Sequence, residues 1–164
     1  MTDLVLLGFR LWLGAVMLAH GVNHARSLDG TTKWFASKGF RPPRPVAIAS
    51  AFGELATGAG LVVGLLTPAA AAGVVMVAAN AFWAIHRFAG FFVFRRPDEG
   101  WEYVATLAVL ATGIAVLGPG EYSLDHLLGW ADALDGWVGL AVVAGGLVVA
   151  SLQLAIGWRR PPED

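Results

Sequence analysis

Residues 4–23, LVLLGFRLWLGAVMLAHGVN, decide the class of this protein. The run holds a single charged residue, Arg10, and its length matches the roughly 20 residues that a helix needs to cross about 30 Å of hydrocarbon. The whole chain agrees, since 57% of its residues are hydrophobic and 14% are charged. Soluble domains carry about 45–50% apolar and about 25% charged residues. The sequence therefore predicts an all-α integral membrane protein.

Four more apolar stretches follow, so we expect a four-transmembrane-helix bundle with a fifth, C-terminal transmembrane helix. The predicted spans are 4–23, 46–66, 68–87, 101–118 and 137–157. Spans two and three are joined only by residues 66–68, and a proline is tolerated in the first turn of a helix, which predicts a tight hairpin. We divide the chain into a bundle with an interfacial loop, 1–130, and a further helix with a basic and then acidic tail, 131–164.

The basic residues are sorted to one side of this arrangement. Ten of the 11 Lys and Arg residues lie in the regions that five crossings place on one face. They are Arg26, Lys33, Lys38, Arg41, Arg44, Arg87, Arg95, Arg96, Arg159 and Arg160. Because basic residues collect on the cytoplasmic side, the sequence predicts a multi-pass plasma-membrane protein with its N-terminus outside and its C-terminus in the cytoplasm.

Two connecting segments are expected to lie at the membrane surface. Residues 119–136 carry four acids and an amphipathic Leu/Trp pattern, which predicts a short interfacial helix or, alternatively, a solvated acidic loop. Residues 24–45 mix aromatic with basic side chains, as headgroup-bound segments do. Their end, GFRPPRP at 39–45, is expected to be extended before the second span begins.

A few polar side chains lie within the spans or at their borders, where such groups are costly and usually functional. Counting about 1.5 Å per residue from one face places them in the same half of the bilayer. As catalytic, proton-exchanging residues we predict Glu54, His20 and His86. As cofactor-binding residues we predict His20, His24, Asn80, Glu54 and Glu102; we assign no metal ligand. The structural alternatives are histidines that bind carbonyls or headgroups, and a Glu54 that pairs with the flexible arm of Arg10.

Five pieces of the sequence, in register, resemble DoxX-like membrane proteins. They are GFRLWLGAVMLAHGVNH (8–24), FGELATGAGLVVGLLTP (52–68), MVAANAFWAIHRFAGFF (76–92), GWEYVATLAVL (100–110) and GPGEYSLDHLL (118–128). The resemblance covers about residues 5–128 and implies a four-helix membrane bundle related to the small subunit of thiosulfate:quinone oxidoreductase. Two positions depart from the pattern. His24 stands where the family usually has Lys, and Pro68 stands where an Arg commonly follows the sequence Gly-Leu-Leu-Thr.

The resemblance also implies a role beside quinones and redox partners. Our first hypothesis is a quinone-interacting membrane subunit, accessory to a redox complex, whose electron donor lies in a partner because the chain has no cysteine and no nucleotide-binding motif. The alternative is a non-catalytic scaffold or assembly subunit, and a haem- or metal-binding protein comes third. Expected partners are the lipid bilayer, other membrane or redox subunits and a second copy of this chain, but not nucleic acid.

Overall fold

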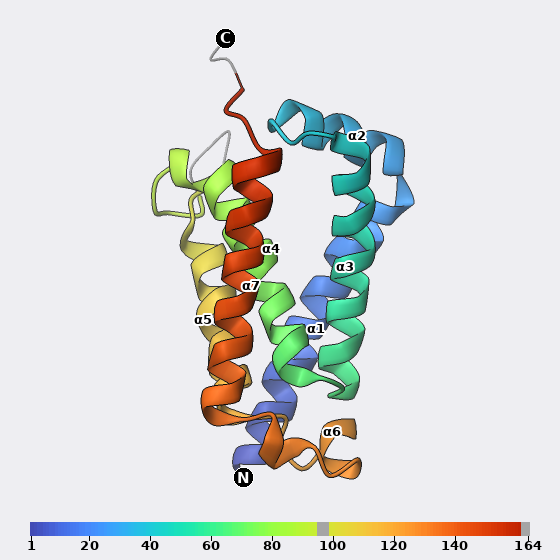
Figure 1. Cartoon of the computed structure of the whole chain (residues 1–164), viewed down its shortest axis with the longest axis vertical. Coiled ribbons are helices and arrows are strands. Elements are labelled where there is room, and N and C mark those ends of the chain that lie inside the picture. Colours follow the sequence, from blue (N-terminus) through green and yellow to red (C-terminus); the bar gives the residue numbers. More distant parts are fainter. Residues whose placement is uncertain (95–98, 162–164) are drawn as a thin grey trace.

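The computed structural model describes residues 1–94 and 99–161, and these residues form helices joined by short connections (Figure 1). The helices are α1 (Thr2–Arg26), α2 (Leu28–Ser37), α3 (Pro43–Val63), α4 (Thr67–Ala84), α5 (Glu102–Leu117), α6 (Leu124–Leu127) and α7 (Gly136–Gly157). Single 3-10 turns lie at His86–Phe88 and Ala131–Ala133. The predicted all-α class is confirmed.

Helices α1, α3, α4 and α7 are long and apolar enough to cross a membrane, so the chain contacts the lipid bilayer. Helix α5 is apolar but has 16 residues, which is about 24 Å and shorter than the hydrocarbon core. It still runs alongside α4 and α7, and the chain starts and finishes at opposite ends of the bundle (Figure 1). Five passes along the bundle therefore occur, four of them in helices of full spanning length.

The long helices form two groups. Helices α1 and α3 pack together on one side, with α2 laid across their end, and α4, α5 and α7 form the other side (Figure 1). Glycines let α1 and α3 approach closely, because a Cβ on Gly58 would lie 2.8 Å from the carbonyl oxygen of Gly14. The groups are joined by the predicted hairpin, in which Gly64 and Leu66 turn with positive φ and α4 starts at Thr67.

The two groups meet in an apolar core at the end of the bundle where the chain starts. The core takes residues from the middle of α1, from the first half of α4 and α7 and from the last part of α3 and α5. Its buried members are Leu13, Met17, Leu61, Ala70, Ala71, Ala72, Val74, Val75, Ala111, Ile114, Ala115 and Val143. This half of the molecule is tightly packed, and the site described below lies in the other half.

Arg10 lies beside this core, 1% exposed, and its guanidinium binds three backbone carbonyls. Nε donates to Leu61 at 3.1 Å, Nη2 donates to Tyr122 at 2.8 Å, and Nη1 donates to Pro119. The predicted pairing of Arg10 with Glu54 is therefore wrong. The arm of Arg10 turns towards the loop after α5, because that loop presents carbonyls within reach and Glu54 lies further along the bundle.

Asp125 holds the same loop from the other side. It is fully buried, and its carboxylate accepts hydrogen bonds from Leu66 N at 2.7 Å and from Thr67 N and Thr67 Oγ1, both at 2.8 Å. Those backbone N–H groups open α4, so Asp125 satisfies donors that a helix start leaves unpaired. The short helix predicted within 119–136 is confirmed as the single turn of α6, and this acid fixes it to the bundle.

The opposite end of the bundle carries the basic residues. Every described Lys and Arg except Arg10 lies on this side, either within α2 or at or next to a helix end; Arg95, Arg96 and the acidic residues Glu163 and Asp164 lie outside the described residues. The prediction that residues 39–45 are extended is wrong for their second half, because α3 already starts at Pro43. A proline lacks only an N–H that would be unpaired at this point of a helix.

Two segments join the helix groups at the basic end. Arg41 N donates to Gly157 O at 2.7 Å, Arg159 N donates to Gly39 O at 2.9 Å, and the indole of Trp158 donates to Lys38 O at 2.8 Å. We call residues 38–41 with 157–159 the clasp. The two groups are thus connected covalently by the α3–α4 hairpin at one end and by hydrogen bonds of the clasp at the other.

Candidate functional site

Between the two helix groups, in the half of the bundle nearest the basic end, lies a cavity of about 700 Å³. Residues from all five long helices and from α2 line it, and most of them are apolar. Five of the six predicted site residues are in its wall: His20, His24, Glu54, Asn80 and His86. Glu102 is not, since it lies at the start of α5 and its carboxylate accepts from Val93 N at 3.2 Å.

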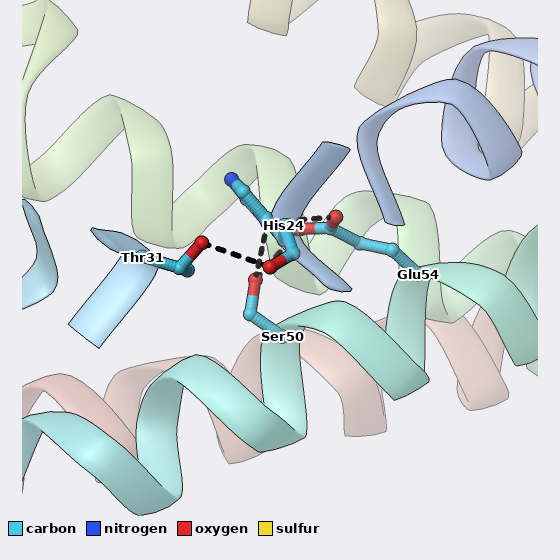
Figure 2. A network of polar contacts seen from close by, with 4 residues as sticks. All are labelled: His24, Thr31, Ser50 and Glu54. Carbon is cyan, nitrogen blue, oxygen red and sulfur yellow. Dashed lines mark hydrogen bonds and ion pairs between the residues drawn. The ribbon is translucent and has the colours of Figure 1, made fainter. Parts of the chain in front are cut away.

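Glu54 is the most buried polar residue of the cavity wall, with 2% of its surface exposed. Ser50, one turn earlier on α3, donates to Glu54 Oε1 at 2.7 Å, and His24 Nδ1 lies 3.0 Å from Oε2. Figure 2 shows Ser50 and Glu54 reaching from α3 towards His24, whose backbone carbonyl accepts from Thr31 Oγ1 at 2.9 Å. Three helices thus fix this carboxylate and imidazole in place.

The two oxygens of Glu54 differ in their surroundings. Oε1 receives a directed hydrogen bond from Ser50. Oε2 lies at ion-pair distance from His24, yet it is buried and receives no directed hydrogen bond from the described residues. The contact with His24 Nδ1 is short but lacks the alignment of a hydrogen bond, and hydrogen bonds weaken steeply away from linearity. Oε2 therefore has room for a further donor.

Asn80 forms a second polar point, contributed by α4. Its Nδ2 donates to Met76 O at 2.9 Å and to Gln153 Oε1 at 3.3 Å. The contact with a backbone carbonyl fixes which end of the amide is nitrogen, and Oδ1 is left buried without a donor among the described residues. Gln153 of α7 also lines the cavity and was missed by the sequence analysis. Its signal was available: Gln153 is the one amide in an apolar helix.

The first helices of the chain, which carry these polar groups, match a known family. A family model described as DoxX matches residues 5–87, about half of the chain. The chain belongs to the DoxX family. It is a membrane protein of that family, and the matched part includes α1 to α4 with five of the six predicted site residues. Neither the curated proteins nor the solved structures contain a match to it.

The two other predicted histidines of this DoxX family member lie at the edge of the cavity. His20 is exposed, one turn before His24 on α1. His86, in the turn after α4, places Nδ1 2.6 Å from Glu99 O. Tyr103 of α5, a further lining residue that was not predicted, is 39% exposed. The buried polar centre therefore consists of Glu54, His24 and Asn80 with their neighbours, and the remaining polar side chains surround it.

Metal chemistry has less support from the geometry. Within residues 1–94 and 99–161, no three His, Asp or Glu side chains lie close enough together to hold a metal ion. His24 and Glu54 form a pair, while His20 and His86 stand apart from them at the edge of the cavity. The site instead combines a large apolar wall with a few convergent polar groups, which is the usual character of an organic ligand site.

Proposed function

We propose that this DoxX family member binds a lipid-soluble quinone in the cavity and serves as a membrane subunit of a redox complex. One observation carries the proposal: an apolar cavity of about 700 Å³ inside the membrane-spanning bundle has a buried carboxylate and a half-buried imidazole in its wall. Ligand pockets usually measure about 300–1,000 Å³. A quinone reaches such a site through the bilayer.

The polar groups suit the proton side of quinone chemistry. Reduction of a quinone takes up two protons for two electrons, and an imidazole can accept or donate a proton near neutral pH. His24 lies between Glu54 and the end of α1 that faces the basic side, so we assign these two residues to proton exchange with the ring. The chain has no cysteine, and we assign the electrons to a partner subunit.

Quinone content of the gently purified protein tests this function. We expect extraction and mass spectrometry to find close to one quinone species per chain in the wild type, and at least a fivefold lower content in Glu54→Ala. Glu121→Ala is the matched control, because Glu121 is exposed at the other end of the bundle. Quinone in the wild type no higher than in co-extracted lipid would contradict the proposal and favour the scaffold role.

We also propose that the basic end faces the cytoplasm of a plasma-membrane protein. Since the chain has no native cysteine, single substitutions at exposed positions report the orientation. With a membrane-impermeant maleimide on intact cells, we expect Ala133→Cys, near α6, to be labelled. Ser37→Cys, at the end of α2, should react only after the membrane is permeabilised. The reverse pattern would place the N-terminus in the cytoplasm.

A further inference from the structure

Two buried side-chain oxygens in the cavity wall are hydrogen-bond acceptors without a donor in the described part of the chain. Glu54 Oε2 and Asn80 Oδ1 are buried side-chain atoms that receive no hydrogen bond from the described residues. A buried polar atom that is left unpaired destabilises the protein, so a donor supplied by a ligand is favourable there. Both residues line the cavity, and the terminal torsions of Glu and Asn side chains are soft, so small rotations present these oxygens to a ligand.

The donors beside these oxygens either bond to other protein acceptors or, in the case of His24, face Glu54 without the alignment of a hydrogen bond. The Ser50 hydroxyl donates to Glu54 Oε1, and Asn80 Nδ2 donates to Met76 O and Gln153 Oε1. His24 Nδ1 lies against Glu54 Oε2. His20 and Tyr103 offer donors only from exposed positions, and the half-buried Thr57 adds one hydroxyl. The buried part of the site therefore accepts hydrogen bonds and has few left to give.

We infer that the cavity prefers a ligand whose polar end donates hydrogen bonds, and that among quinone species it selects the reduced quinol. A quinol carries two phenolic O–H groups, which can donate to Glu54 and Asn80. A quinone presents two carbonyl oxygens, which would face these acceptors and leave them unpaired. This inference rests on the proposed function, namely that a quinone species occupies the cavity at all.

Equilibrium binding of both redox forms tests the preference. Purified protein in nanodiscs is titrated calorimetrically, under argon, with a decyl-substituted benzoquinone and with its reduced quinol. We expect the quinol to bind at least tenfold more tightly. For a two-electron couple, a tenfold preference for the reduced form raises the midpoint potential of the bound pair by about 30 mV.

Two variants assign the preference to the named oxygens. Glu54→Gln is nearly isosteric and adds an N–H₂ donor, so the ratio of quinol to quinone affinity should fall at least fivefold. Asn80→Leu removes the second acceptor and should lower the same ratio. Glu121→Gln is the control and should keep the wild-type ratio. Because each ratio is measured within one variant, partial loss of folded protein does not change it.

The outcomes separate the inference from the proposed function. Equal binding of both forms, or tighter binding of the quinone, would overturn the preference and leave quinone binding intact. A wild-type ratio in Glu54→Gln and Asn80→Leu would also overturn it, because the selection would then come from other groups. Binding of neither form would overturn the proposed function, and the inference with it.

Discussion

Arg10→Met should lower the free energy of unfolding by about 3–5 kcal/mol, the largest effect that we expect from a single side chain. The substitution keeps an unbranched apolar stem but removes the donors for Leu61 O, Pro119 O and Tyr122 O. It also removes the cation whose field acts on the buried Asp125. The loss should appear as a lower thermal midpoint in a fixed detergent and as a smaller monodisperse peak in size exclusion.

Two further variants sharpen this test. Arg10→Lys should recover little stability, because one ammonium cannot reproduce the planar fork that reaches three carbonyls. Arg44→Met is the matched control: Arg44 is exposed and pairs with Asp29 at 2.9 Å, and such surface pairs contribute about 0–1 kcal/mol. An Arg10→Met protein with the stability of the control would show that the loop carbonyls find other donors.

Gly139→Ala should separate α7 from α5. An added Cβ at residue 139 would lie 1.8 Å from Ala115 O, a backbone atom that cannot rotate away. Forcing extra atoms into packed helices typically costs about 1–3 kcal/mol, and more when backbone must shift. Because α7 also supplies Gln153 and one side of the clasp, we expect faster proteolysis of residues 136–160 and less bound quinone.

The matched control for this prediction lies on the same helix. Gly145 faces open space, so Gly145→Ala adds the same methyl group without a contact. Alanine is favoured over glycine within helices by about 1 kcal/mol, so this variant should be as stable as the wild type or slightly more stable. Equal behaviour of the two variants would show that α5 and α7 adjust to the extra atom.

Hydropathy, depth and local turn chemistry predicted the features that depend only on the position of a residue along its helix. The spans followed from apolar length, the hairpin from Pro68, and the meeting of Glu54, Asn80 and the histidines from counting residues along each helix. These signals suffice because a bilayer restricts where polar groups and helix ends can lie. The span predicted at 101–118 corresponds to α5, which covers two residues fewer, Glu102–Leu117.

Partners across the bundle could not be read in this way. Arg10 binds backbone carbonyls, which every residue possesses, so no sequence pattern marks Leu61, Pro119 or Tyr122 as its partners. Glu102 has the right depth but points its carboxylate at a backbone N–H beside the bundle end. No site residue was predicted on the last helix, so Gln153 was overlooked. Such contacts depend on how each helix is rotated about its own axis. The depth of a residue in the bilayer does not determine that rotation.

The clasp has a consequence for the order in which the bundle is made. A chain leaves the ribosome from its N-terminus, so residues 38–41 and every other wall of the cavity are present before residues 157–159 exist. Throughout synthesis the basic end of the bundle lacks these hydrogen bonds between the two helix groups, and it acquires them only when α7 is complete. The nascent bundle therefore passes through a stage in which the α3–α4 hairpin already joins the two helix groups and the clasp does not yet exist.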